Sequence, residues 1–299
     1  MSRTLKELEE FIIENFEVHN FQDNILSKDI VISGFSSINN TKTKTISWIN
    51  KNTLDSSKIK SELVIAPIEF NLNESVKFDI IQIDNPRLAF AKILRSFFSK
   101  TRKHDIHNSA FIHNKTNIAD NVSIGAYSSV GENVIIGKNT IIEKNVHISN
   151  NVSIGSDCHI KSNTVIGEEG FGVVKDEDKS FIKIPHFGSV IIGNNVELGS
   201  MNTVNRGTIE DTIIMDGVKT DDHVHIAHNC IIEQNVIMTP GVTLCGSVYV
   251  SEGSWLGAQC TILEGVKIEK ESFIGIGAVV IKDTQSKSTY IGNPARKFK

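Results

Sequence analysis

An aliphatic residue recurs at every sixth position over more than half of this chain of 299 residues. The first run has no exception: Ile112, Ile118, Ile124, Val130, Ile136, Ile142, Ile148, Ile154, Ile160 and Ile166. The series resumes at Ile192 to Val204 and, after a four-residue slip, continues from Ile214 to Val280, with Thr220 as its one polar member. A period of six fits neither a helix nor a simple alternating strand. It predicts a parallel β-helix, in which each hexad supplies one short strand and one turn.

A second column of small or β-branched residues lies two positions before each of these aliphatic residues, and turn-forming Gly, Asn, Asp and Lys separate the hexads. With three hexads in each triangular coil, roughly 25 hexads predict about eight coils and a stack about 40 Å long. Cys158, Cys230 and Cys260 fall in this second column. They are therefore expected to be buried, reduced thiols, as in a cytoplasmic protein.

Residues 1–103 lack the hexad, so we expect a small α/β domain at 1–103 and a β-helix domain at 104–299. Leu5, Leu8, Phe11, Ile12 and Phe16 have helical spacing. Residues 30–33, 45–49 and 62–66 are expected to be short strands. Asn85 and Pro86 can open a second helix, as cap and first residue. Its buried face would contain Leu88, Phe90, Ile93, Leu94 and Phe97.

Composition excludes several other classes of protein. The formal net charge of -4 argues against a nucleic-acid-binding protein, which normally has a basic excess. No apolar run is long enough to span a bilayer, and the N-terminus lacks the apolar core of a secretory signal. The cysteines form no C-x-x-C pair, so we expect no structural zinc. These features predict a soluble, cytoplasmic protein.

Two interruptions of the repeat are the candidate functional loops, because solenoids usually place function where the repeat breaks. The first is 167–189, and the second is the slip at 205–214. Soon after the second break, residues 220–230 (TDDHVHIAHNC) contain His223, His225 and His228.

His228 is the candidate general base. Ile226 is inward in the hexad, so His228 is expected at an outer corner of the coil. A neutral imidazole there can accept a proton near neutral pH, although a solvated surface histidine would have the same spacing. Asp221 or Asp222 could orient its ring. The three histidines could instead bind zinc, as in a γ-class carbonic anhydrase, but an N-terminal domain has no role in that chemistry.

Several segments resemble the UDP-3-O-acylglucosamine N-acyltransferases of lipid A synthesis. They are ISWINKN (46–52), NPRLAFAKIL (85–94), GEEGFG (167–172), IPHFGSVIIG (184–193), NRGTIEDTII (205–214) and IAHN (226–229). The resemblance implies a left-handed parallel β-helix that works as a homotrimer, with each active site between two subunits. It also implies that the first domain binds a nucleotide and that His228 is the catalytic base.

The resemblance, together with the chemistry of the residues themselves, suggests which residues bind the substrates. Trp48 and Asn50 would hold the uridine, with a buried core tryptophan as the alternative for Trp48. The acceptor would contact Phe171, Gly172, His186, Arg206, His225 and Asn229, although a structural arginine joining neighbouring turns would account for Arg206 equally well. The acyl donor would contact Gly246, Gly257, Ala258 and Arg296. No permanently bound cofactor and no metal is implied.

Two stretches depart from the family pattern. The tail YIGNPARKFK (290–299) instead resembles sugar acetyltransferases that use acetyl-CoA, and ILEGVKI (262–268) lacks the family's second histidine. Both departures favour a short acyl group carried by CoA over a long chain on acyl carrier protein. The predicted function is N-acylation of a nucleotide-linked amino sugar for surface polysaccharide or lipopolysaccharide. The alternatives are the lipid A enzyme itself and a non-catalytic, sugar-binding solenoid.

Overall fold

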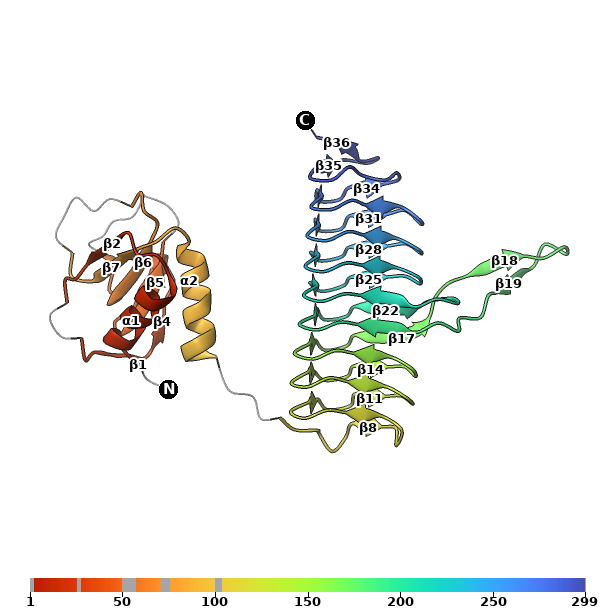
Figure 1. The fold of residues 1–299 in the computed structure, drawn as a ribbon, viewed down its shortest axis with the longest axis horizontal. Helices are drawn as coiled ribbons and strands as arrows, with labels where there is room; N and C mark the ends of the chain where they lie inside the picture. Colours follow the sequence, from red (N-terminus) through yellow and green to blue (C-terminus); the bar gives the residue numbers. More distant parts are fainter. Residues whose placement is uncertain (1–2, 26–27, 50–57, 71–75, 100–103, 299) are drawn as a thin grey trace. The chain divides into compact units, whose positions relative to one another are not determined.

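The chain forms two compact units, Met1–Arg102 and Lys103–Lys299 (Figure 1). The computed structural model describes residues 3–25, 28–49, 58–70, 76–99 and 104–298. Within these ranges no helix is long and apolar enough to cross a membrane.

The first unit is built on a five-stranded sheet in the order β2-β7-β6-β5-β4. Strands β4 to β7 are parallel and β2 runs antiparallel to β7. Helices α1 (Leu5–Asn15) and α2 (Pro86–Ile93) share one apolar cluster with the sheet. The strands are β2 (Asn20–Gln22), β4 (Gly34–Phe35), β5 (Thr45–Trp48), β6 (Leu63–Ala66) and β7 (Asp79–Gln82). The remaining elements are the pair β1 (Arg3–Thr4) and β3 (Val31–Ile32), the 3-10 turn η1 (Ile38–Asn40) and the π-helical turn η3 (Leu94–Phe98).

Both predicted helices of this unit are confirmed. Thr4 caps α1, with its hydroxyl accepting from the Glu7 N–H. Asn85 caps α2, and its Oδ1 accepts from the Leu88 N–H at 2.9 Å. The predicted buried face of α2 is partly wrong, because Leu88 is 46% exposed. Ile93 is buried as predicted, whereas Ala89 is buried in place of Leu88.

A buried charge cluster joins α1 to β7. Lys28 Nζ lies 3.1 Å from Glu9 Oε1 and 2.8 Å from Asp23 Oδ1, and it also contacts the fully buried Asp79 carboxylate. Burial first, and then the neighbouring Asp79, raise the pKa of Glu9 to about 7 despite the opposing effect of Lys28. The folded unit therefore holds a proton on Glu9 that the unfolded chain releases at lower pH.

We expect the first unit to lose stability as pH rises from about 4.5 to 7. The folded state favours protonated Glu9. The contribution of Glu9 to the free energy of unfolding is therefore complete below its pKa in the unfolded chain and is lost as pH rises through its pKa in the folded unit. Each unit of pKa difference corresponds to about 1.4 kcal/mol, so the loss is on the order of 3 kcal/mol. Unfolding of a Trp255→Phe background, followed by fluorescence of Trp48 in this unit, measures it.

Glu9→Gln is the matched variant, because glutamine keeps the size and the hydrogen-bonding capacity of a protonated glutamate. It should abolish the pH slope between 4.5 and 7. An unchanged slope in the variant would show that another group is responsible.

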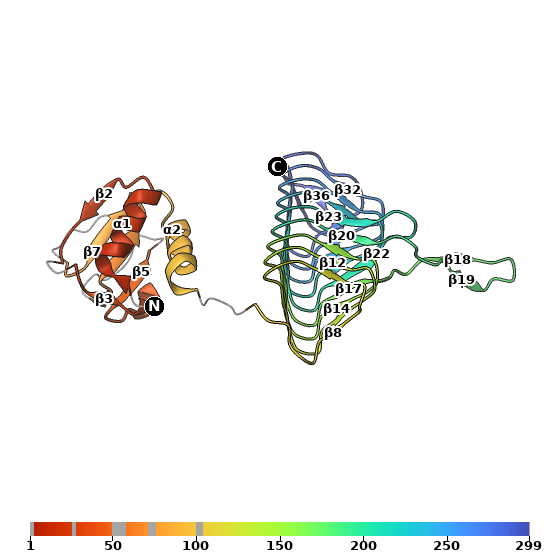
Figure 2. The ribbon, with the colours of Figure 1, turned by 60° about the horizontal axis from the view of Figure 1, so that its bottom comes forward.

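The second unit is a parallel β-helix whose coils overlie one another as rounded triangles (Figure 2). Each coil contributes one short strand to each of three parallel sheets. The sheet that bears the candidate site contains β8 (Phe111–Ile112), β11 (Ser129–Val130), β14 (His147–Ile148), β17 (Val165–Glu169), β22 (Thr203–Arg206), β25 (His225–Ile226), β28 (Thr243–Leu244), β31 (Thr261–Ile262) and β34 (Val279–Val280). The predicted β-helix with a preceding α/β unit is thereby confirmed.

The other two sheets complete the coils. The second contains β9 (Asn117–Ile118), β12 (Ile135–Ile136), β15 (Ser153–Ile154), β20 (Val190–Ile192), β23 (Thr212–Ile214), β26 (Ile231–Ile232), β29 (Tyr249–Val250) and β32 (Lys267–Ile268). The third contains β10 (Ser123–Ile124), β13 (Ile141–Ile142), β16 (His159–Ile160), β21 (Glu197–Leu198), β24 (Lys219–Thr220), β27 (Ile237–Met238), β30 (Trp255–Leu256), β33 (Phe273–Ile274), β35 (Thr289–Ile291) and the antiparallel β36 (Arg296–Lys297).

The hexad residues form the core of this unit, as predicted. From Val122 to Val280 the inward aliphatic side chains make up one continuous buried cluster. The four cysteines are free, and Cys158, Cys230 and Cys260 are buried in the second column. Burial raises the pKa of the Cys230 and Cys260 thiols to about 12, so these thiols are neutral packing groups.

The first predicted interruption leaves the stack as a hairpin. Strands β18 (Val173–Lys175) and β19 (Phe181–Lys183) pair antiparallel and project away from the coils (Figure 1). Its exposed side chains include several charged ones at the tip and three large aromatic ones, Phe171 (87% exposed), Phe181 (70%) and Phe187 (82%). Apolar exposure of this kind is typical of an interaction surface.

Candidate functional site

The two interruptions of the repeat meet at one corner of the β-helix. The Phe187 N–H donates to the Thr208 carbonyl at 2.8 Å, and the Gly188 N–H donates to the Gly207 carbonyl at 3.0 Å. The Ser189 N–H donates to Asp211 Oδ1 at 2.7 Å. The two loops, which are separated in sequence by a complete coil, are therefore one structural unit.

His228 lies at this corner, two residues after β25. Its Nδ1 donates to Asn229 Oδ1 at 3.0 Å. The same oxygen accepts from the Thr208 N–H at 3.1 Å and from the Thr208 hydroxyl at 3.0 Å, so it is an acceptor only. The proton of the neutral imidazole is thus held on Nδ1, and the lone pair on Nε2 is free to accept another proton.

Two glycines pack directly against the His228 ring. A Cβ atom on Gly170 would lie 2.8 Å from His228 Cδ2, and one on Gly246 would lie 2.6 Å from Cε1 and 2.8 Å from Nε2. Neither position therefore has room for a side chain while the ring stays in place. Gly170 is in the first interruption and Gly246 is in the next coil, so both sides of the ring are restrained.

His186 is the second ring of the site. It is 4% exposed, its Nδ1 donates to the Ile184 carbonyl at 2.9 Å, and its ring centroid lies 5.3 Å from that of His228 in an edge-to-face arrangement. Among the described residues, none hydrogen-bonds its Nε2. A buried acceptor without a donor is costly, and this one lies 2.9 Å from the space that a Gly170 side chain would fill.

The prediction that Asp221 orients His228 is wrong. Asp221 is exposed, and its Oδ1 accepts from the Asp222 N–H at 2.8 Å, as in an ordinary turn. Asp222 instead caps the coil below, accepting from the Ser200 N–H. Asn229 orients the ring, since the carboxamide adjacent to His228 is held by Thr208 from the second interruption.

His225 lies on β25 on the outward face, as predicted. Its Nδ1 is 2.6 Å from Thr203 Oγ1, and burial, together with nearby His228, lowers its pKa. His223 is in an exposed turn with a positive φ of 60°. The three histidines do not gather as metal ligands. In the described parts of the chain, the one group of such side chains is the exposed trio Glu17, His19 and Asp84 of the first unit.

Arg206 joins neighbouring turns. Its Nε donates to the Gly167 carbonyl at 2.6 Å and its Nη2 to the Asn150 carbonyl at 2.9 Å, which is the structural alternative considered for it. Phe171 is the exposed residue after Gly170 and is free to contact a ligand. Gly172 packs on His186, since a Cβ there would lie 3.2 Å from His186 Cε1.

The predicted donor-binding residues do not lie together. Gly246 comes just after β28 of the site-bearing sheet and adjoins His228. Gly257 and Ala258 come just after β30 of the third sheet, at a different corner of the coil. A Cβ on Gly257 would lie 2.6 Å from the Ile274 carbonyl oxygen, so coil stacking alone requires glycine. Arg296, on β36, is exposed and bonds the Ala295 carbonyl.

Trp48 is in the first unit, at the end of β5. It is half-buried and packs beside Phe90 of α2, with ring centroids 6.4 Å apart. Part of its surface is therefore accessible while the rest belongs to the core. Asn50 lies outside the described residues.

Parts of the chain are similar to known proteins. The family model for the bacterial transferase hexapeptide (six repeats) matches residues 133–168. A UDP-3-O-acylglucosamine N-acyltransferase from Dechloromonas aromatica (strain RCB) is 49% identical over 88 residues, which cover 29% of this chain and 25% of the relative. The one from Janthinobacterium sp. (strain Marseille) is 35% identical over 133 residues, covering 44% and 38%. These matches thus span between a quarter and two fifths of the relatives' length.

Solved structures match over more of the chain. LpxA from Acinetobacter baumannii has a TM-score of 0.59 and 28% identity, covering 64% of this chain and 73% of that one. The UDP-N-acetylglucosamine O-acyltransferase (LpxA) of Moraxella catarrhalis has a TM-score of 0.57 and 26% identity, with the same coverage. The chain is therefore a β-helix protein with hexapeptide repeats, and part of it is similar to part of the UDP-3-O-acylglucosamine N-acyltransferases.

Proposed function

We propose that the protein is an acyltransferase that moves an acyl group from a thioester to the amine of a nucleotide-linked amino sugar. The observation that carries the proposal is the contact of His228 Nδ1 with Asn229 Oδ1, an oxygen that can only accept, so Nε2 is the ring nitrogen left to take up a proton. An amine attacks a thioester carbonyl only in its deprotonated form, so a proton acceptor at that corner is what the reaction needs.

The proposed reaction needs no covalent enzyme intermediate. The sugar nitrogen attacks the thioester carbon, Nε2 of His228 takes the proton of the nitrogen, and the carbon–sulfur bond then breaks. The departing thiolate receives that proton and leaves as a thiol. The Gly246 N–H is a candidate donor to the developing oxyanion, because it is adjacent to the ring and no carbonyl within the described residues accepts from it.

The remaining site residues have proposed places in the same scheme. Trp48 and Asn50 of the first unit would bind the nucleotide base, where stacking is worth about 1–3 kcal/mol. Phe171, Gly172, His186, Arg206 and His225 would surround the acceptor. The donor thioester would lie at Gly246, beside the His228 ring, and other parts of the donor would contact Gly257, Ala258 and Arg296.

We further propose that the protein works as a homotrimer in the cytoplasm, where CoA and acyl carrier protein thioesters are made. The exposed aromatic side chains of the β18–β19 hairpin would be covered by a neighbouring subunit. A cleft between two subunits would align donor and acceptor better than one face of a single β-helix.

The acyl donor is either a CoA thioester or an acyl carrier protein thioester, and a transfer assay distinguishes the two. Purified protein is incubated with a UDP-linked amino sugar and either acetyl-CoA or a long-chain acyl carrier protein, and the mass of the product is measured by mass spectrometry. We expect acetylation from acetyl-CoA. Transfer of the long chain alone would identify the reaction with the one named for the relatives, the lipid A enzyme. If neither donor gives a product, the remaining interpretation is a non-catalytic β-helix protein that binds a sugar.

A further inference from the structure

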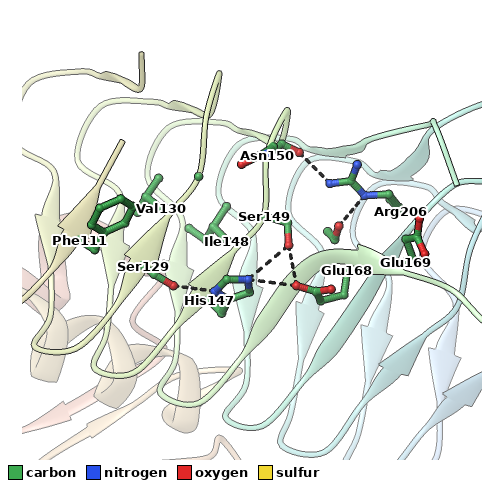
Figure 3. Close-up of a pocket in the computed structure, with 12 residues that line it drawn as sticks. Phe111, Ser129, Val130, His147, Ile148, Ser149, Asn150, Glu168, Glu169 and Arg206 are labelled. Carbon is green, nitrogen blue, oxygen red and sulfur yellow. Dashed lines mark hydrogen bonds and ion pairs between the residues drawn. The ribbon is translucent and has the colours of Figure 1, made fainter. Parts of the chain in front are cut away.

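A cleft with both apolar and polar lining, here called the β14 cleft, lies on the outward face of the sheet that leads to His228. Its volume is about 390 Å³, within the usual range for small-ligand sites. The side chains that define it are Phe111, Ser129, His147, Ser149, Glu168 and Arg206, which come from five successive coils (Figure 3). None of the roles assigned above uses His147, Glu168 or either serine.

A continuous hydrogen-bonded network holds four of these side chains in place, those of Ser129, His147, Ser149 and Glu168. The His147 ring is bonded on both nitrogens, with Nδ1 2.6 Å from Ser129 Oγ and Nε2 3.0 Å from Glu168 Oε1 (Figure 3). The Ser149 hydroxyl donates to the same Glu168 oxygen at 3.0 Å. Glu168 Oε2 and Arg206 Nη1 have no partner among the described residues, so an acceptor and a donor both remain for a ligand.

The cleft is connected to the His228 corner. Thr203 on β22 pairs with His225 on β25, so Arg206 is one coil from His228. Gly167 lines the cleft, and Gly170, three residues later, packs against the His228 ring. With strands about 4.8 Å apart, β14 is about 14 Å from β25. A ligand extending along the sheet from the reacting amine would enter the cleft.

The chemistry of the lining selects against two kinds of ligand. Its charges balance, because Arg206 is opposed by Glu168, while Glu169 forms an ion pair with Lys183. A phosphate would therefore find no excess positive charge. An acyl chain would make no use of the free Glu168 oxygen and the free Arg206 nitrogen, which a hydroxylated ligand can bond.

The lining does suit a sugar ring. One ring hydroxyl can donate to the free Glu168 oxygen and another can accept from the free Arg206 nitrogen, and Phe111, 63% exposed at the far end, can cover an apolar ring face. The order Ser129, His147, Glu168 resembles a catalytic triad, but the neighbouring backbone N–H groups are committed to the ladder. Those of Ser129 and Gly131 donate to the Val146 and Ile148 carbonyls, so an oxyanion would have no donor there.

We propose that the β14 cleft binds a neutral, hydroxylated ring, recognised through Glu168 and Arg206, with His147 positioning the Glu168 carboxylate. The proposal rests on the proposed function in one respect: the ring would belong to the acceptor and would be one other than the ring that is acylated. A ribose, a further sugar of the acceptor and a free glycan share this chemistry, and separate titrations distinguish them.

The test is calorimetric titration of the full chain with two probes, UDP-N-acetylglucosamine and a methyl glucoside. His147→Ala and Glu168→Ala should each raise the Kd about tenfold to a hundredfold, since hydrogen bonds to charged groups are among the stronger ones. An effect on the nucleotide sugar alone assigns the ring to the acceptor. An effect on both probes assigns the cleft to a free sugar.

His159→Ala is the matched control, because His159 on β16 forms an equivalent pair with Glu143, at 2.9 Å, on a different sheet. It should leave both affinities unchanged. Equal Kd values for His147→Ala, Glu168→Ala and the parent chain, with equal thermal unfolding, would overturn the proposal. So would a failure of the parent chain to bind either probe. The protein could also bind the sugar in a His147-dependent way and yet catalyse no acyl transfer. That result would refute the proposed function but support the proposal for the β14 cleft.

Discussion

Replacing His228 with alanine is expected to lower the rate of acyl transfer about 10²- to 10⁴-fold, the usual contribution of a general base. The expected loss is large because Nε2 of His228 carries the lone pair that accepts the proton. Asn229 orients the ring, and Gly170 and Gly246 enclose it. Steady-state kinetics with the donor that the transfer assay identifies measure the effect. It should appear in kcat, since the base acts in the transition state.

His228 is half-buried and outside the aliphatic core, so the variant should fold normally. The melting temperature of His228→Ala should therefore match that of the parent. His159→Ala, an equally conservative change on another sheet, should keep full activity. If His228→Ala transfers acyl groups at the parental rate, the base assignment is wrong, even if the protein proves to be an acyltransferase.

Adding one methyl group at Gly246 is expected to reduce activity about 100-fold without removing any catalytic group. The new Cβ would lie 2.6 Å from His228 Cε1 and 2.8 Å from Nε2, closer than carbon and nitrogen atoms can approach. The ring must turn or shift, and a displacement of about 1 Å at a reacting group can cost about 10²-fold in rate. Kinetics of Gly246→Ala, together with its melting temperature, test this prediction.

Gly265→Asn is the control for this variant. Gly265 is in the following coil and has a φ of +71°, and a Cβ atom added there would have no other atom within 4 Å. Asparagine already occupies many such turns in this chain, including Asn229 and Asn235, so the substitution should be tolerated. Parental activity in Gly246→Ala would mean that the His228 ring is not held where the reaction needs it.

Much of the fold follows from the local pattern of the chain. Each hexad places one aliphatic residue inward, and stacking identical coils buries those residues in one column, so the repeat is sufficient to predict the β-helix. The helix caps Thr4 and Asn85 are equally local, because they act within three residues. The buried face of α2 was harder to predict, because Leu88 and Ala89 are adjacent and the sheet beneath selects between them.

The candidate site was only partly predictable. His228 and the two interruptions are visible in the repeat, because the breaks are measured against a strict period. The orienting residue was misassigned to Asp221, since a carboxylate is the familiar partner of a histidine and the role of a neighbouring amide depends on Thr208. The β14 cleft was missed, although outward residues one position before the hexad aliphatics, such as Ser129 and His147, could have been aligned at the spacing of one coil.

The sequence by itself determined the β-helix, the position of its breaks and the histidine at its corner, because these depend on a short-range period. Only the tertiary structure decided how 167–189 and 205–214 join, why Gly170 and Gly246 are glycine, and which group holds the His228 proton. These depend on contacts between coils, where an insertion in one loop changes the register with the next. Distance along the chain then no longer indicates distance in space.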